Sequence, residues 1–212
     1  MKKVIILDMG HGSNTPGKCS PDRTFFEFRF NRQVGVKLGK MLKEAGYKVL
    51  YTWDGDKEPL YQELTMLYKA QLNECLRYRY RKVNEYCRQF GTKNCICISI
   101  HSNAASHSGW QNARGTCVMV GRNASEASKR LAKAVYAQAL AQGFKGNRYV
   151  PSEHYWMQAL AMCEQTNCPA ILTENLFYDN KEDLAILKSE EGVNKIVKMH
   201  FDGIVNFCNN EK

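Results

Sequence analysis

Short apolar segments, each followed by a turn or by polar residues, are the feature that most constrains what this chain can fold into. They are rich in Val, Ile, Leu, Cys and aromatic residues, the composition of strands that are buried in a sheet. Turns rich in Gly, Asp or Asn follow several of them. The segments that are predicted to form strands span residues 4–7, 47–53, 95–100, 115–121 and 170–173.

Amphipathic segments lie between these strands. Their apolar residues recur every three or four positions, which predicts helices over residues 30–45, 60–90, 125–142 and 193–205. Strands that are joined through helices pair in parallel. No repeat or low-complexity linker divides the 212 residues. The sequence therefore predicts an α/β fold, a single domain over residues 1–212 with a mostly parallel, mixed and twisted sheet and helices on both faces.

The charge of the chain favours an anionic partner. Thirty Lys and Arg residues against 21 Asp and Glu residues give a net charge of +9, so nucleic acid, an anionic cell wall or a membrane surface could attract it. No apolar run approaches the roughly 18 residues of a membrane span. The four apolar residues after Lys2 and Lys3 are too few for a secretory signal. We therefore expect synthesis in the cytoplasm without a signal peptide, and no membrane insertion.

The nine cysteines are expected to be reduced and to pack in the core. Their number is odd and no Cys-x-x-Cys pair occurs, which argues against a disulfide framework or a thiolate metal site. Cys95 and Cys97 alternate with isoleucines, so both thiols would lie on one face of a strand as small apolar groups.

Three residues with metal-binding or catalytic side chains follow or end predicted strands: His11, His101 and Glu174. Because ligand sites of open α/β sheets lie at the carboxyl ends of the strands, these side chains are expected to converge. Two imidazoles and a carboxylate suit a zinc ion that keeps an open position for water. Each histidine could instead be a hydrogen-bonded structural residue, which is the role expected for the other histidines, His107, His154 and His200.

Four segments together resemble zinc-dependent N-acetylmuramoyl-L-alanine amidases. They are the Gly-His-Gly segment at residues 6–12, Pro-Gly at 16–17, the His-Ser-Asn-Ala segment at 99–104, and Pro-Ala-Ile-Leu-Thr-Glu at 169–174. The resemblance extends over nearly the whole chain. It implies one zinc ion and cleavage of the amide that joins the lactyl group of N-acetylmuramic acid to L-alanine in peptidoglycan, which would be the partner of the protein.

The resemblance also assigns roles to two carboxylates. It implies that Glu27 is the third zinc ligand, with His11 and His101. The spacing of Thr24 and Glu27 is equally that of a capping box, in which Glu27 would bind a backbone amide at a helix start. The resemblance makes Glu174 the catalytic carboxylate, which would take a proton from water and give it to the departing amine. The alternative is a structural acid paired with Lys or Arg.

Substrate contacts follow less directly from the resemblance. Asn103, Arg79 and Trp110 are the candidate substrate-binding residues: Asn103 lies in the His-Ser-Asn-Ala segment, Arg79 forms an Arg-x4-Asn pair with Asn84, and Trp110 lies in a loop over residues 105–114 that looks longer than usual. The chain departs from the family pattern at three positions, Ser13, Trp53 and Leu176, the last of which stands where glycine usually precedes Phe177.

Two rival functions are open to such a sequence. One is a cysteine peptidase that uses Cys19 or Cys163, although neither has a clear helix-start context with a matched base. The other is a basic nucleic-acid-binding α/β module without hydrolytic activity, suggested by the interleaved Arg and Tyr residues at 77–82. On a helix these side chains would point around the cylinder, so a solvated surface is favoured and nucleic acid is not the expected partner.

The expected biological setting is that of a phage endolysin. A wall-degrading enzyme without a signal peptide or a separate wall-binding domain must reach its substrate by other means, and phage endolysins do so after the membrane has been breached. A bacterial amidase whose export signal is missing is the alternative. The sequence carries no indication of the oligomeric state.

Overall fold

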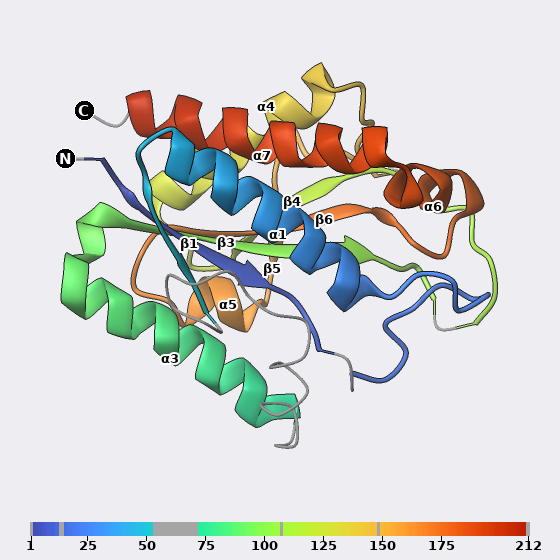
Figure 1. The fold of residues 1–212 in the computed structure, drawn as a ribbon, viewed down its shortest axis with the longest axis horizontal. Coiled ribbons are helices and arrows are strands. Elements are labelled where there is room, and N and C mark those ends of the chain that lie inside the picture. The colour runs from blue at the N-terminus through green and yellow to red at the C-terminus, as the bar shows by residue number, and fades with distance from the viewer. Residues whose placement is uncertain (1, 13–14, 53–71, 107, 148, 211–212) are drawn as a thin grey trace.

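A mixed β-sheet forms the centre of the computed structural model (Figure 1), which describes residues 2–12, 15–52, 72–106, 108–147 and 149–210. Most of its strands are short and apolar, in agreement with the prediction. In the described residues the sheet has six strands: β1 (Val4–Met9), β2 (Lys48–Tyr51), β3 (Cys95–Asn103), β4 (Cys117–Gly121), β5 (Trp156–Gln158) and β6 (Ala170–Phe177).

The order of the strands brings the predicted site residues to one edge. Across the sheet the order is β2-β1-β3-β6-β4-β5, and the first four strands in that order run parallel. β4 runs antiparallel to β6, and β5 runs parallel to β4. The carboxyl ends of β1, β3 and β6 therefore meet at the edge where β4 begins. In the register of the strands, His101 lies opposite Glu174, and Glu174 lies opposite Cys117.

Helices cover both faces of the sheet (Figure 1). The helices α1, α4 and α7 pack on one face, where the alternate strand residues Ile5, Leu7, Ile96 and Ile98 are buried. On the other face, α3 and α5 cover Val4, Ile6, Cys95 and Cys97. The helices are α1 (Glu27–Glu44), α3 (Leu72–Phe90), α4 (Glu126–Ala141), α5 (Ala161–Glu164), α6 (Lys181–Lys188) and α7 (Glu190–Asn210).

The predicted α/β architecture is confirmed, with several local differences. Helix α1 begins three residues before the first apolar position of its pattern, because Glu27 opens the helix. The predicted helix over residues 60–90 is described only from Leu72 onward. The short elements β5, α5 and α6 were not predicted, since three to eight residues are too few to establish a period.

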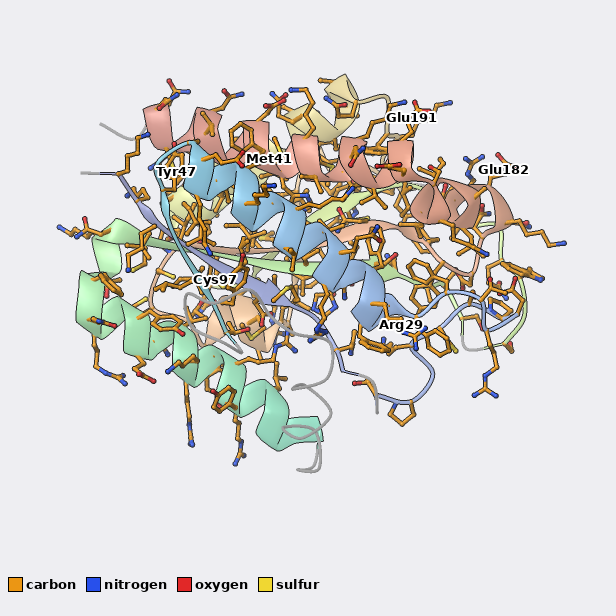
Figure 2. All side chains as sticks on the ribbon, in the orientation of Figure 1. Arg29, Met41, Tyr47, Cys97, Glu182 and Glu191 are labelled. Carbon is orange, nitrogen blue, oxygen red and sulfur yellow. The ribbon has the colours of Figure 1, made fainter. Side chains whose placement is uncertain are left out.

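Eight of the nine cysteines have side chains that the structure describes, and these eight have free thiols. Cys95 and Cys97 are fully buried, which confirms their predicted packing role. Figure 2 shows Cys97 on the sheet, in the layer that α3 covers. None of the helices in the described part of the chain has the length and apolar character needed to cross a bilayer.

Candidate functional site

The loop after β1 carries His11 in an uncommon backbone conformation. His11 has a φ of 60°, in the left-handed region that non-glycine residues seldom adopt. Flanking Gly10 and Gly12 give this short turn conformational freedom. Gly10 has a second role, because a Cβ atom at this position would overlap three ring atoms of His101. The missing side chain of Gly10 therefore allows His101 to pack against the β1 loop.

His11, Glu27 and His101 come together from three elements. Glu27 is the first residue of α1, close to Arg29 at the end of the helix where β1 and β3 also end (Figure 2). Its Oε1 atom lies 3.1 Å from Nδ1 of His101 and 3.5 Å from Nε2 of His11. The two imidazole rings meet edge to face, with centroids 4.8 Å apart. One nitrogen of each ring and one Glu27 oxygen thus lie within 4.8 Å of one another.

Glu27 does not cap its helix. The N-cap residue of α1 is Phe26, and no side chain accepts a capping hydrogen bond there. Oε1 of Glu27 instead accepts a hydrogen bond from the backbone amide of Ser102 at 3.1 Å, which turns the carboxylate toward the histidines. The hydroxyl of Thr24 donates to Asp22, 3.0 Å away. The capping-box interpretation is therefore wrong.

The charge states of His11 and Glu27 are those of metal ligands. Burial lowers the pKa of His11 to about 3, so its imidazole is neutral near pH 7. Burial opposes ionisation of Glu27, but the hydrogen bond with His101 and the two imidazoles hold its pKa below the usual value. Oε2 of Glu27 is buried and makes no hydrogen bond with the described residues. A buried carboxylate oxygen without a partner, close to the neutral imidazole of His11 and to the ring of His101, fits a bound cation.

Glu174 lies on β6 next to His101 on β3. Burial, and then the negative charge of Glu27, raise the pKa of Glu174 well above its usual value. Its Oε2 atom is buried and has no hydrogen-bond partner in the described residues, and no ion pair among these residues includes it. The alternative role of a structural acid paired with Lys or Arg thus finds no support. A carboxyl group with a raised pKa, close to a candidate metal site, is suited to proton transfer.

The three candidate substrate-binding residues occupy different environments. Asn103 ends β3, two residues after His101, and lines a cavity of about 590 Å³. Arg79 on α3 is buried and bonded to Asp8, with 2.7 Å between its Nε and Oδ1 of Asp8. Trp110 lies at the surface beneath the ammonium group of Lys181, 5.5 Å from its ring centroid, and is not part of the cavity wall. The structure brings only Asn103 to the cavity.

Two backbone features at this edge could not be read from the pattern of apolar residues. Gly10 makes room for His101, and its only signal is the pair of glycines around His11. Leu176 adopts a φ of 62°, which explains in physical terms why glycine is usual at this position. Ser13 and Trp53, the other departures from the family pattern, lie outside the described residues.

The structure describes two of the three remaining histidines, His154 and His200. His200 is a core residue, because its Nε2 lies 2.9 Å from the hydroxyl of Thr173 and its Nδ1 lies 2.7 Å from the carbonyl of Ile196. This confirms its predicted structural role. His154 lies in a loop against the ring of Tyr136, and His107 lies outside the described residues.

The features behind the rival functions have ordinary structural explanations. Burial raises the pKa of Cys163 to about 12, the opposite of what an activated nucleophile needs. On α3, Arg77 and Arg81 are exposed while Arg79 is buried, so the basic residues point around the helix as predicted.

The whole chain is similar to known peptidoglycan amidases. A family model described as N-acetylmuramoyl-L-alanine amidase matches residues 5–206. An endolysin of Bacillus phage SPP1 is 25% identical over 216 residues, which cover 100% of this chain and 68% of that protein.

Solved structures agree with the fold. The CwlD amidase of Clostridioides difficile, solved in complex with the GerS lipoprotein, is 23% identical with a TM-score of 0.76, and the match covers 98% of this chain and 99% of that one. The catalytic domain of the CD27L endolysin, which targets Clostridia difficile, is 24% identical with a TM-score of 0.69, and the match covers 97% and 98% of the two chains.

These matches decide between the functions that the sequence left open. The alternative of a basic module without hydrolytic activity is wrong, because the family is one of hydrolytic enzymes. Since the family model matches nearly the full length of the chain, the chain belongs to the N-acetylmuramoyl-L-alanine amidase family and is an enzyme that hydrolyses an amide bond of peptidoglycan.

Proposed function

We propose that this chain is a zinc-dependent amidase that separates stem peptides from the glycan strands of peptidoglycan at the N-acetylmuramoyl-L-alanine bond. The observation that carries the proposal is the convergence of His11, Glu27 and His101 within 4.8 Å at the sheet edge where Glu174 lies in register with His101. A site of this kind, in a chain of this family, supports metal-assisted hydrolysis.

His11, Glu27 and His101 would hold the zinc ion. Two imidazoles and one carboxylate supply nitrogen and oxygen donors of the kind that zinc prefers, and three protein ligands leave an open coordination position. When bound, zinc supplies a Lewis acid that activates water and polarises the scissile carbonyl. The backbone amide of Ser102, which donates to Glu27, fixes the carboxylate that would serve as ligand.

Glu174 would move the proton. Its raised pKa suits a group that accepts a proton from the attacking water and then delivers it to the amine of the departing L-alanine. Burial raises the pKa of Glu174, which makes its carboxylate form a stronger base, whereas the hydrogen bond with His101 keeps Glu27 ionised. The two carboxylates would therefore have different roles: Glu27 would bind the metal, and Glu174 would accept the proton of the water.

Glu174→Gln and His101→Ala test these assignments. Glu174→Gln should retain zinc while turnover falls by at least about 100-fold, the lower end of general acid-base contributions. His101→Ala should lose zinc and activity together. Glu191→Gln, a change at the start of α7 (Figure 2), serves as the matched control and should leave both unchanged. If Glu174→Gln loses its zinc, or keeps near wild-type turnover, the proposed role of Glu174 is wrong.

We also propose an endolysin role for the chain: a catalytic domain that is made in the cytoplasm and acts on the wall after membrane breach. The similarity to the endolysin of Bacillus phage SPP1 supports this role. The net charge of +9 would favour contact with an anionic wall. Cells that express the chain should lyse only when their membrane is permeabilised, and lysis of intact expressing cells would contradict the proposal.

A further inference from the structure

The pairing of β3 with β6 in the sheet (Figure 1) is irregular beside the candidate site. The register of the two strands shifts between His101 and Asn103. In this interval one residue of β3, Ser102, faces two residues of β6, Asn175 and Leu176. A β-bulge of this kind redirects side chains, and bulges are frequent next to active sites. The bulge therefore affects how His101 is oriented.

Two buried side chains hold this bulge by reciprocal hydrogen bonds. Nδ2 of Asn175 donates to the carbonyl of His101 at 2.7 Å. The hydroxyl of Ser102 donates to the carbonyl of Asn175 at 2.9 Å. Both side chains are buried, and a low-dielectric surrounding strengthens such bonds. Each side chain thus binds the backbone of the opposite strand, and we call the two residues the Ser102–Asn175 pair.

The backbone of Leu176 shows why the bulge needs such support. Its φ of 62° lies in the left-handed region, which is unfavourable for a residue with a bulky side chain. An unfavourable backbone conformation persists only where the surrounding structure imposes it. The hydroxyl of Ser102 also lies 3.4 Å from the carbonyl of Leu176. The Ser102–Asn175 pair is therefore part of the structure that imposes this conformation.

The side-chain amide of Asn175 is itself fixed in orientation. Nδ1 of the neutral His200 ring lies 2.7 Å from the carbonyl of Ile196, which can only accept, so Nδ1 carries the proton and Nε2 is an acceptor. The hydroxyl of Thr173, 2.9 Å from Nε2, therefore donates to His200. The oxygen of this hydroxyl then accepts from Nδ2 of Asn175 at 3.2 Å. This chain of hydrogen bonds leads from α7 to β6 and directs Nδ2 toward His101.

The Ser102–Asn175 pair acts on the candidate metal ligands through the backbone. Asn175 binds the carbonyl of His101, and the backbone amide of Ser102 donates to Oε1 of Glu27 at 3.1 Å. A change in the path of β3 at the bulge would therefore move the ring of His101 and the carboxylate of Glu27 relative to each other. Groups that orient metal ligands in this way strongly affect metal affinity.

We propose that Ser102 and Asn175 are positioning residues, which hold the bulge in the path that aligns His101 and Glu27 as metal ligands. Neither side chain is itself a ligand, and each acts through the backbone that it binds. The inference rests on the proposed function, since it gives these residues a part in building the proposed zinc site.

The zinc affinity of two variants tests the Ser102–Asn175 pair. Asn175→Leu removes the amide at nearly constant volume, and Ser102→Ala removes one hydroxyl. Competition with a chromophoric chelator should show a zinc affinity about 10- to 100-fold lower in each variant. The double variant should lose less than the product of the two factors, because both side chains hold the same bulge. Asn94→Leu is the matched control and should bind zinc like the wild type, because Nδ2 of Asn94 donates to the carbonyl of Phe90 at 2.8 Å, at the other end of β3.

Hydrogen exchange of the metal-free protein tests the same inference without zinc. The backbone amide at position 102 should be protected in the wild type by its bond to Glu27. Its exchange should be at least about tenfold faster in Asn175→Leu and unchanged in Asn94→Leu. A wild-type protein that binds no zinc would contradict the proposed function, whereas this change in exchange would still support the role of the pair in placing Glu27.

Three results would overturn the inference. The first is a zinc-binding wild type whose affinity both single variants match within about twofold, even where their melting temperatures fall, since the bonds would then be structural only. The second is unchanged exchange at position 102 in Asn175→Leu. The third is an equal loss of zinc affinity in Asn94→Leu, which would indicate a general loosening of β3. If Asn175→Leu does not fold, Ser102→Ala, which removes a single oxygen atom, is used for both measurements.

Discussion

Gly10→Ala is a one-atom test of the candidate metal site. The added Cβ would overlap three atoms of the His101 imidazole, all much closer than the 3.4 Å at which ordinary van der Waals contact begins. The ring would have to retreat by about 1 Å, which exceeds the roughly 0.5 Å within which a site must hold its groups. His101 would then no longer be aligned with Glu27 and His11. We expect zinc affinity to fall about 10- to 100-fold, the range found when the surroundings of a ligand are disturbed.

Competition with a chromophoric chelator measures this affinity, and thermal denaturation of the metal-free protein measures the cost of overpacking. His101→Ala provides the matched background, because it removes the ring that the new Cβ would meet. Gly10→Ala should lower the stability of the wild-type protein by about 1 to 3 kcal/mol, but should cost little in the His101→Ala background. Wild-type zinc affinity in Gly10→Ala, or equal destabilisation in both backgrounds, would refute the reasoning.

Three further predictions concern groups around the site. Arg79→Met should lower the free energy of unfolding by about 3 to 5 kcal/mol in denaturant titrations, because it leaves the carboxylate of Asp8 buried without its partner. Adding Asp8→Asn should recover part of the loss, and an unchanged stability with a raised KM would instead make Arg79 a substrate contact. Burial lowers the pKa of His200 from 6.5 to about 4, so the unfolded chain binds a proton at a higher pH than the folded chain does. The contribution of His200 to the free energy of unfolding is therefore complete above pH 6.5 and is lost as the pH falls toward 4. Relative to His200→Gln, the wild type should lose on the order of 3 kcal/mol of stability across that range, and parallel pH profiles would contradict this. Leu176→Gly should relieve about 1 kcal/mol of backbone strain, but it removes a buried side chain that contributes about 2 to 5 kcal/mol. The melting temperature of the variant should therefore fall, and a rise would show that the strain is the larger effect.

The sequence predicted most of the architecture but not the direction of every strand. Continuous apolar runs mark β1, β3 and β6, and the helices between them imply parallel pairing. The antiparallel pairing of β4 with β6 depends on the path of the connecting chain, and the spacing of apolar residues does not specify that path. β5 has three residues, too few for any pattern.

The candidate site was predictable to different extents. His11, His101 and Glu174 could be grouped because each follows or ends an apolar strand. Glu27 required the family resemblance, because its spacing from Thr24 fits a helix cap equally well, and only the folded chain turns its carboxylate toward the histidines. Tyr149, which lines the same cavity as Asn103, lies in a loop, where no periodicity indicates which residues line a cavity.

Mass analysis of the products released from purified peptidoglycan tests the central claim most directly. Digestion by the zinc-loaded protein should release stem peptides with a free amino group on L-alanine and leave glycan strands that retain their lactyl groups. Removal of zinc with a chelator should abolish this release, and added zinc should restore it. Products with new reducing sugar ends, peptides cut between amino acids, or undiminished release from a protein shown to contain no metal would contradict the account.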